Sequence, residues 1–207
     1  MKKILIIAAV GTIALTSFAL TASYKTLSGS GNASAGAEVD FLSDPSLQFR
    51  LVNVNYSSDS NSAVLSLSTG GTALAITATN AASTSTTNQV NTTNGLANSA
   101  TLFLEHGGAA YIATCSSYGN TGTNGLNGGT VTNVNYVVLA SGGFGTATTV
   151  SDSVYVMTAP VTLPIGAATN SLNGDAIFVG SGGRPVRVVL TPALNTNRLN
   201  AVTGRYE

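Results

Sequence analysis

The chain has 207 residues and a formal net charge of zero. Only 8% of its residues are charged, against about 25% in ordinary soluble domains. No Lys or Arg occurs between Leu51 and Gly183, which excludes a phosphate-binding surface for nucleic acid over the body of the chain. Hydrophobic residues make up 43%, enough for a packed core, so a disordered chain is excluded as well.

The first residues have the build of a secretory signal peptide. Lys2 and Lys3 precede an apolar run over residues 4–22, which ends in small residues. We therefore predict a cleaved signal peptide at residues 1–22 and an extracellular mature protein without cofactors. The alternative is a retained helix like that of a type IV pilin, since the run is nearly long enough to cross a bilayer.

Residues 23–44 are predicted to form an N-terminal tail that serves as a donor strand. Small or apolar residues alternate with polar ones, as in a β-strand with one apolar face. That face comprises Leu27, Gly29, Gly31, Ala33, Ala35, Ala37, Val39 and Phe41. The pattern leaves open whether the strand enters its own sheet or a neighbour's sheet. A flexible spacer rich in Gly, Ser and Ala is the alternative.

Residues 45–207 are predicted to form one antiparallel β-sandwich, so the fold class is all-β. Short runs rich in Val, Ile, Leu, Tyr and Thr alternate with Gly, Asn and Ser clusters. The runs cover residues 46–56, 63–68, 73–79, 100–106, 109–115, 131–140, 149–157, 161–165, 175–180 and 186–192. Gly70-Gly71, Gly107-Gly108 and Gly182-Gly183 are predicted turns. Residues 80–100 and 116–129 are predicted loops, and Cys115 is predicted to be a buried thiol.

Catalytic and metal-binding motifs find little support in the sequence. A triad would have to use His106, the only histidine, with Glu105 or a distant Asp, and no nucleophile elbow or zinc motif is present. A turn residue is the favoured interpretation of His106. Glu38, Asp40 and Asp44 form a small acidic group, for which a solvated face is favoured over a calcium site. We therefore predict no enzyme activity, no metal and no small-molecule substrate.

Three sequons, at Asn32, Asn55 and Asn91, predict N-linked glycans on an exported chain. The leader, the alternating tail and these sequons resemble the archaeal thread pilin, a glycosylated subunit of thin surface filaments. The resemblance implies an Ig-like or pilin-like sandwich completed by the N-terminal strand of the next subunit. It also implies that Leu27, Ala33, Ala35, Ala37, Val39 and Phe41 face the neighbour's groove.

The expected function is therefore that of a structural subunit of an extracellular pilus, a head-to-tail homopolymer used in surface adhesion or cell–cell contact. TasA-like fibre proteins and bundling pilins are the nearest alternatives, because they share the leader, the size and strand exchange. A second class is a non-polymeric adhesin or surface-layer module, whose tail would fold onto its own domain. A secreted hydrolase that depends on His106 is the third.

Overall fold

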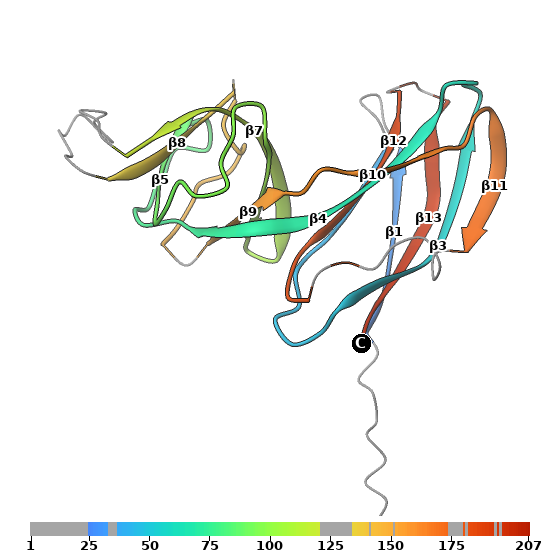
Figure 1. Ribbon diagram of the computed structural model, residues 1–207, viewed down its shortest axis with the longest axis horizontal. Helices are drawn as coiled ribbons and strands as arrows, with labels where there is room; N and C mark the ends of the chain where they lie inside the picture. The colour runs from blue at the N-terminus through green and yellow to red at the C-terminus, as the bar shows by residue number, and fades with distance from the viewer. Residues whose placement is uncertain are drawn as a thin grey trace, which may run out of the picture.

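The computed structural model describes residues 25–32, 37–120, 134–140, 142–150, 152–173, 180, 182–192, 194 and 196–207. All regular elements in these ranges are β-strands, and every pairing is antiparallel, which confirms the all-β prediction (Figure 1). No helix in the described part of the chain has the length and hydropathy needed to cross a membrane. The predicted signal peptide lies outside the described residues.

The strands contain between 4 and 12 residues each. In order, they are β1 (Lys25–Asn32), β2 (Ala37–Phe41), β3 (Phe49–Ser58), β4 (Val64–Ala75), β5 (Thr87–Val90), β6 (Thr101–His106), β7 (Ala109–Gly119), β8 (Asn135–Leu139), β9 (Ser153–Met157), β10 (Val161–Pro164), β11 (Ala168–Asn173), β12 (Val186–Thr191) and β13 (Arg198–Tyr206). Alternate residues along several of these strands are buried, as expected where one face of a sheet covers a core.

The first core lies between two sheets that form a β-sandwich. One sheet has the order β1-β13-β3-β11, and the facing layer has β2, β12, β4 and β10 side by side. Inward side chains of β3, among them Phe49 and Leu51, meet those of β4 and β12, among them Leu65 and Val188. All four side chains have 0% exposure. Burial of such side chains contributes roughly 1.5–3 kcal/mol each.

A second core is enclosed by β5 to β9 and the C-terminal half of β4. The strand order continues from β4 through β9, β6, β7 and β8 to β5. A bridge between Ile76 and Val90 then returns β5 to the end of β4, so the strands surround their hydrophobic residues. Figure 1 shows β4 passing from one group of strands to the other. The sequence predicted one sandwich over residues 45–207, whereas the buried residues of this range form two separate clusters.

The predicted turn at Gly70-Gly71 is wrong, because β4 runs straight through it. Here β4 changes partner from β12 to β9, and the β4–β9 register is irregular between Gly70 and Ala73. A Cβ at Gly70 would lie 2.7 Å from Cδ of Pro185. The glycine therefore permits close packing inside a strand, and it does not reverse the chain.

The predicted loop over residues 80–100 is also wrong in part. It contains β5, and Val90 and Leu96 belong to the second core. Strands β11 and β13 were not predicted, since their polar and glycine-containing sequences lack the usual run of β-branched residues. The turn at Gly107-Gly108 is confirmed, and both residues have the positive φ that glycine adopts readily.

Candidate subunit interface

The two N-terminal strands are edge strands, one in each layer of the sandwich. β1 pairs only with β13 among the described strands, with Lys25 opposite Tyr206 and Asn32 opposite Arg198. β2 pairs only with β12, with Ala37 opposite Leu190. The tail is therefore not one straight strand of a single sheet. Its two parts dock onto neighbouring segments near the C-terminus of the chain.

The alternation predicted from the sequence is confirmed over β2. Ala37, Val39 and Phe41 point into the first core, with exposures of 0%, 7% and 4%. The side chain of Glu38 is exposed, and that of Asp40 is partly covered on the opposite face. In this chain, the apolar face of β2 fills its own sandwich.

The remaining predicted interface residues lie N-terminal to β2. Leu27 is in β1, where it is opposite Gly204 of β13. Ala33 and Ala35 lie outside the described residues. The structure therefore brings Ala37, Val39 and Phe41 together in one buried face and says nothing of the contacts of the other three side chains.

Arg187 of β12 links to both acidic residues of β2. Its guanidinium pairs with the Glu38 carboxylate, and its Nη1 lies 3.8 Å from Oδ2 of Asp40. Arg187 and Asp40 are cross-strand neighbours, so the pairing follows directly from the β2–β12 register. Only 15% of the Asp40 side chain is exposed. The predicted solvated acidic face is thus partly an ion-paired strand contact.

Burial raises the pKa of Asp40 to about 6, although the charge of Arg187 opposes this shift. The folded state therefore binds a proton more readily than the unfolded chain does. The rise from the ordinary pKa of 3.8 to about 6 corresponds to about 3 kcal/mol, which the folded chain gains as the pH falls from above 6 to below 4. Mild acid should thus strengthen the docking of β2.

We expect the free energy of unfolding to rise by up to about 3 kcal/mol between pH 7.5 and pH 4, relative to the variant Asp40→Asn. The variant cannot titrate at this position, so its pH profile reports the other carboxylates alone. Urea unfolding at a series of pH values measures both profiles. Parallel profiles for the two proteins would show that Asp40 ionises normally in the folded chain.

The end of β2 is fixed by aromatic packing. The ring of Phe49 lies 4.9 Å from the ring of Phe41 and 5.5 Å from that of Tyr206. Gly204 lies against the Phe49 ring, and a Cβ at this glycine would clash with that ring. The Tyr206 hydroxyl donates a hydrogen bond to the carbonyl of Leu42, and burial raises the pKa of this phenol. The last strand of the chain thus holds the residue that follows β2.

A polar contact joins Ser43, which lies shortly after β2, to the second group of strands. The backbone N–H of Ser43 donates to Glu105 Oε1 at 2.5 Å, and its hydroxyl donates to Oε2 at 2.7 Å. Tyr155 Oη lies 3.2 Å from the same hydroxyl. These partners are 62 and 112 residues from Ser43 in the sequence, so no local pattern could reveal them.

Two of the three sequons have described side chains, and both are exposed. Asn55 lies in the middle of β3 on the outer face, with its Oδ1 accepting from Nδ2 of Asn200 at 3.3 Å. Asn91 follows β5, and its Oδ1 accepts from the N–H of Ala75. Asn32 ends β1, and its side chain lies outside the described residues.

His106 forms a pair with a distant aspartate. Its Nδ1 lies 2.9 Å from both carboxylate oxygens of Asp152, whereas Glu105 binds Ser43. Asp152 also accepts hydrogen bonds from the N–H and hydroxyl of Thr149. No serine hydroxyl in the described part of the chain is hydrogen-bonded to His106. The pair thus connects the β6–β7 hairpin to the turn before β9.

The described residues contain no group of three or more His, Cys, Asp or Glu side chains that could hold a metal ion. Cys115 is 1% exposed, which confirms the prediction of a buried thiol, and burial raises its pKa. Comparisons with protein-family models, curated proteins and solved structures gave no match to this chain. Only the geometry and chemistry of the chain itself therefore bear on its function.

Proposed function

We propose that this protein is a structural subunit of an extracellular filament, joined head-to-tail by the exchange of its N-terminal strands. The edge positions of β1 and β2 are the observation that carries this proposal. An edge strand at a chain terminus can leave without breaking any pairing between the other strands. The secretory leader and the exposed sequons at Asn55 and Asn91 support an extracellular location.

Exchange preserves the contacts that β2 makes in its own chain. Removal of β2 would uncover the hydrogen-bonding edge of β12 and the part of the first core that Ala37, Val39 and Phe41 cover. The same strand from a second copy satisfies both, because added strands recognise a sheet edge by main-chain hydrogen bonds and by alternate side chains in pockets. A contact in which each copy donates to the next produces a filament when the rotation between copies does not close a ring.

Strand exchange can be tested with single cysteines at a cross-strand position. Glu38 and Val189 are register partners on the outer face, at a spacing that suits a disulfide. We expect assembled protein made from a mixture of the Glu38→Cys and Val189→Cys chains to yield covalent dimers on a non-reducing gel. Each variant assembled alone serves as the control for random cross-linking.

The double variant Glu38→Cys/Val189→Cys gives the reciprocal test. A covalent ladder supports exchange, because each subunit is then linked to two others. A monomer with an internal disulfide, together with unlinked chains in the mixture of single variants, would overturn the proposal. Electron microscopy of protein with and without residues 23–41 shows directly whether filaments depend on the tail.

A non-polymeric surface adhesin or surface-layer module is the second candidate. It is favoured by the pairing of β1 and β2 within their own chain, which leaves the sandwich complete as a monomer. This candidate predicts an internal disulfide in the double-cysteine variant and a monomer at all concentrations.

A further inference from the structure

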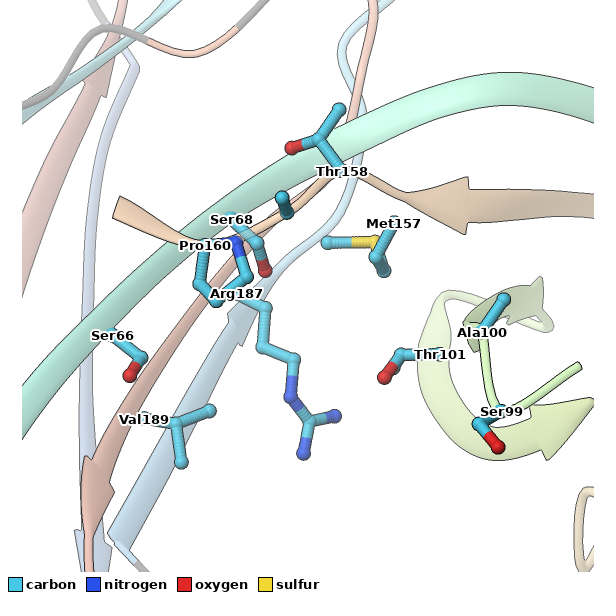
Figure 2. A pocket seen from close by; sticks show the side chains of 11 residues that line it. Ser66, Ser68, Ser99, Ala100, Thr101, Met157, Thr158, Pro160, Arg187 and Val189 are labelled. Atoms are coloured by element: carbon cyan, nitrogen blue, oxygen red, sulfur yellow. The ribbon is translucent and has the colours of Figure 1, made fainter. Parts of the chain in front are cut away.

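A cavity of about 390 Å³ lies on the outer face of β4 and β12, beside the second group of strands (Figure 2). Ser66 and Ser68 of β4 and Arg187 of β12 form its floor, because their neighbours Leu65, Leu67 and Val188 point the other way, into the first core. The opposite wall is formed by Ser99, Ala100 and Thr101. The volume falls within the range of about 300–1,000 Å³ usual for ligand sites, which occur preferentially where two structural units meet.

Hydroxyl groups dominate the polar lining. Those of Ser66, Ser68, Ser99 and Thr101 make no hydrogen bond with any other part of the chain that the structure describes. The fifth hydroxyl, of Thr158, is already bound to the backbone of Thr69. Each free hydroxyl can both donate and accept, so this lining suits a ligand that itself carries several hydroxyl groups.

Arg187 extends into the middle of the cavity, as Figure 2 shows. Only 15% of its side chain is exposed, and its buried Nη1 has no hydrogen-bond partner in the described part of the chain. This atom is closed to solvent and lies 3.8 Å from Oδ2 of Asp40, so the cavity presents the rest of the guanidinium to a ligand. The positive charge, however, is already compensated by Glu38 and Asp40, so the site has no surplus charge that would attract an anion.

The backbone at Ser99 adds an independent observation. Its φ is 66°, and no other non-glycine residue in the described part of the chain has a positive φ. The conformation is held by a hydrogen bond of 2.8 Å from the N–H of Ser99 to the carbonyl of Cys115. Ser99 is the third residue of a turn closed by a hydrogen bond of 3.1 Å from the N–H of Ala100 to the carbonyl of Ala97, a position where positive φ is common. Non-glycine residues with positive φ are uncommon, and strained ones cluster at functional sites.

From these features we propose that the cavity binds a neutral saccharide unit. The free hydroxyls and the Arg187 N–H meet the sugar hydroxyls, while Met157, Pro160 and Val189 offer apolar surface to its C–H groups. No lining residue belongs to β1 or β2, and β2 supplies the two carboxylates beside Arg187 whether it comes from the same chain or from a neighbour. The sugar comes either from an N-glycan on another copy or from the glycans of another surface.

Saturation-transfer NMR tests the site with glucose, mannose, galactose and N-acetylglucosamine, and with glucuronate as a charged comparator. We expect at least one neutral sugar to bind and the variant Ser68→Ala/Thr101→Val to bind at least about tenfold more weakly. Thr169→Val, on exposed β11 and outside the cavity, is the matched control and should bind like the wild type. Ser66→Ala repeats the test with a single mild change.

Three results would overturn this assignment: no transfer to any neutral sugar, tighter binding of glucuronate, or equal binding by the cavity variants. The source of the sugar is distinguished by comparing the glycosylated protein with a variant in which Asn32, Asn55 and Asn91 are replaced by Gln. If the glycans of another copy occupy the cavity, the glycosylated protein binds added sugar more weakly than the variant does, because its own glycans compete for the site. If the sugar belongs to another surface, both proteins bind glycans alike.

Discussion

Phe49→Ala is expected to lower the free energy of unfolding by about 3–5 kcal/mol, the usual cost of truncating a buried phenylalanine. Phe49 has 0% exposure and contacts the rings of Phe41 and Tyr206, which belong to strands from the two ends of the chain. Its ring also lies against Gly204, which has no side chain that could fill the space. The truncated side chain therefore leaves a cavity where β2, β3 and β13 meet.

Urea unfolding followed by tyrosine fluorescence and circular dichroism measures this loss, since the chain contains no tryptophan. Tyr118→Ala is the matched control, because Tyr118 is 42% exposed at the end of β7. Its effect should stay within about 0.5 kcal/mol. A loss below about 1 kcal/mol for Phe49→Ala would mean that the aromatic group does not anchor the sandwich.

Periodicity alone was sufficient to predict the strand character of β2 and the burial of its odd-numbered residues. Val39 and Phe41 are buried and Glu38 is exposed, as a period of two requires when one face of a strand covers a core. The same reasoning correctly located most strands of the body, because their apolar residues are β-branched or aromatic and are separated by turn residues.

The partner of each strand could not be predicted, because pairing depends on contacts distant in sequence. The sequence did not show that residues 25–32 and 37–41 join different sheets, although both lie within one alternating segment. The Gly70-Gly71 pair was mistaken for a turn, since only the neighbouring Pro185 explains why a side chain is absent there. The second core was missed for the same reason. Its strands are joined by polar segments, and these segments do not indicate which strands pair.

The polar contacts at the candidate interface were equally hidden. Glu38 and Asp40 were predicted to face solvent, and nothing near them in sequence indicates Arg187, which is 149 residues from Glu38. Their pairing arises only when β2 lies beside β12 in a defined register. A similar register places Ser66 and Ser68 next to Val189 and Arg187. The free hydroxyls of the cavity therefore result from the sheet and from no sequence motif.

Ala37→Asp is expected to have the largest effect of any single change in the tail. Ala37 has 0% exposure in the first core, opposite Leu190 of β12. A carboxylate placed there has no partner, and an uncompensated buried charge costs about 3–5 kcal/mol. The strand should therefore leave its groove, with a matching fall in the free energy of unfolding. If exchange joins the subunits, filaments should be absent as well, because the same face of β2 then fills a neighbour's core.

Glu38→Ala is the matched control, one residue away on the opposite face of β2. It removes the exposed ion pair with Arg187, which should change the free energy of unfolding by less than about 1 kcal/mol. Urea unfolding and electron microscopy should therefore separate the two variants completely. Wild-type stability and normal filaments in Ala37→Asp would show that this face of β2 is not buried, in the chain or between chains. Loss of stability with filaments retained would mean that β2 completes its own sandwich and that other contacts join the subunits.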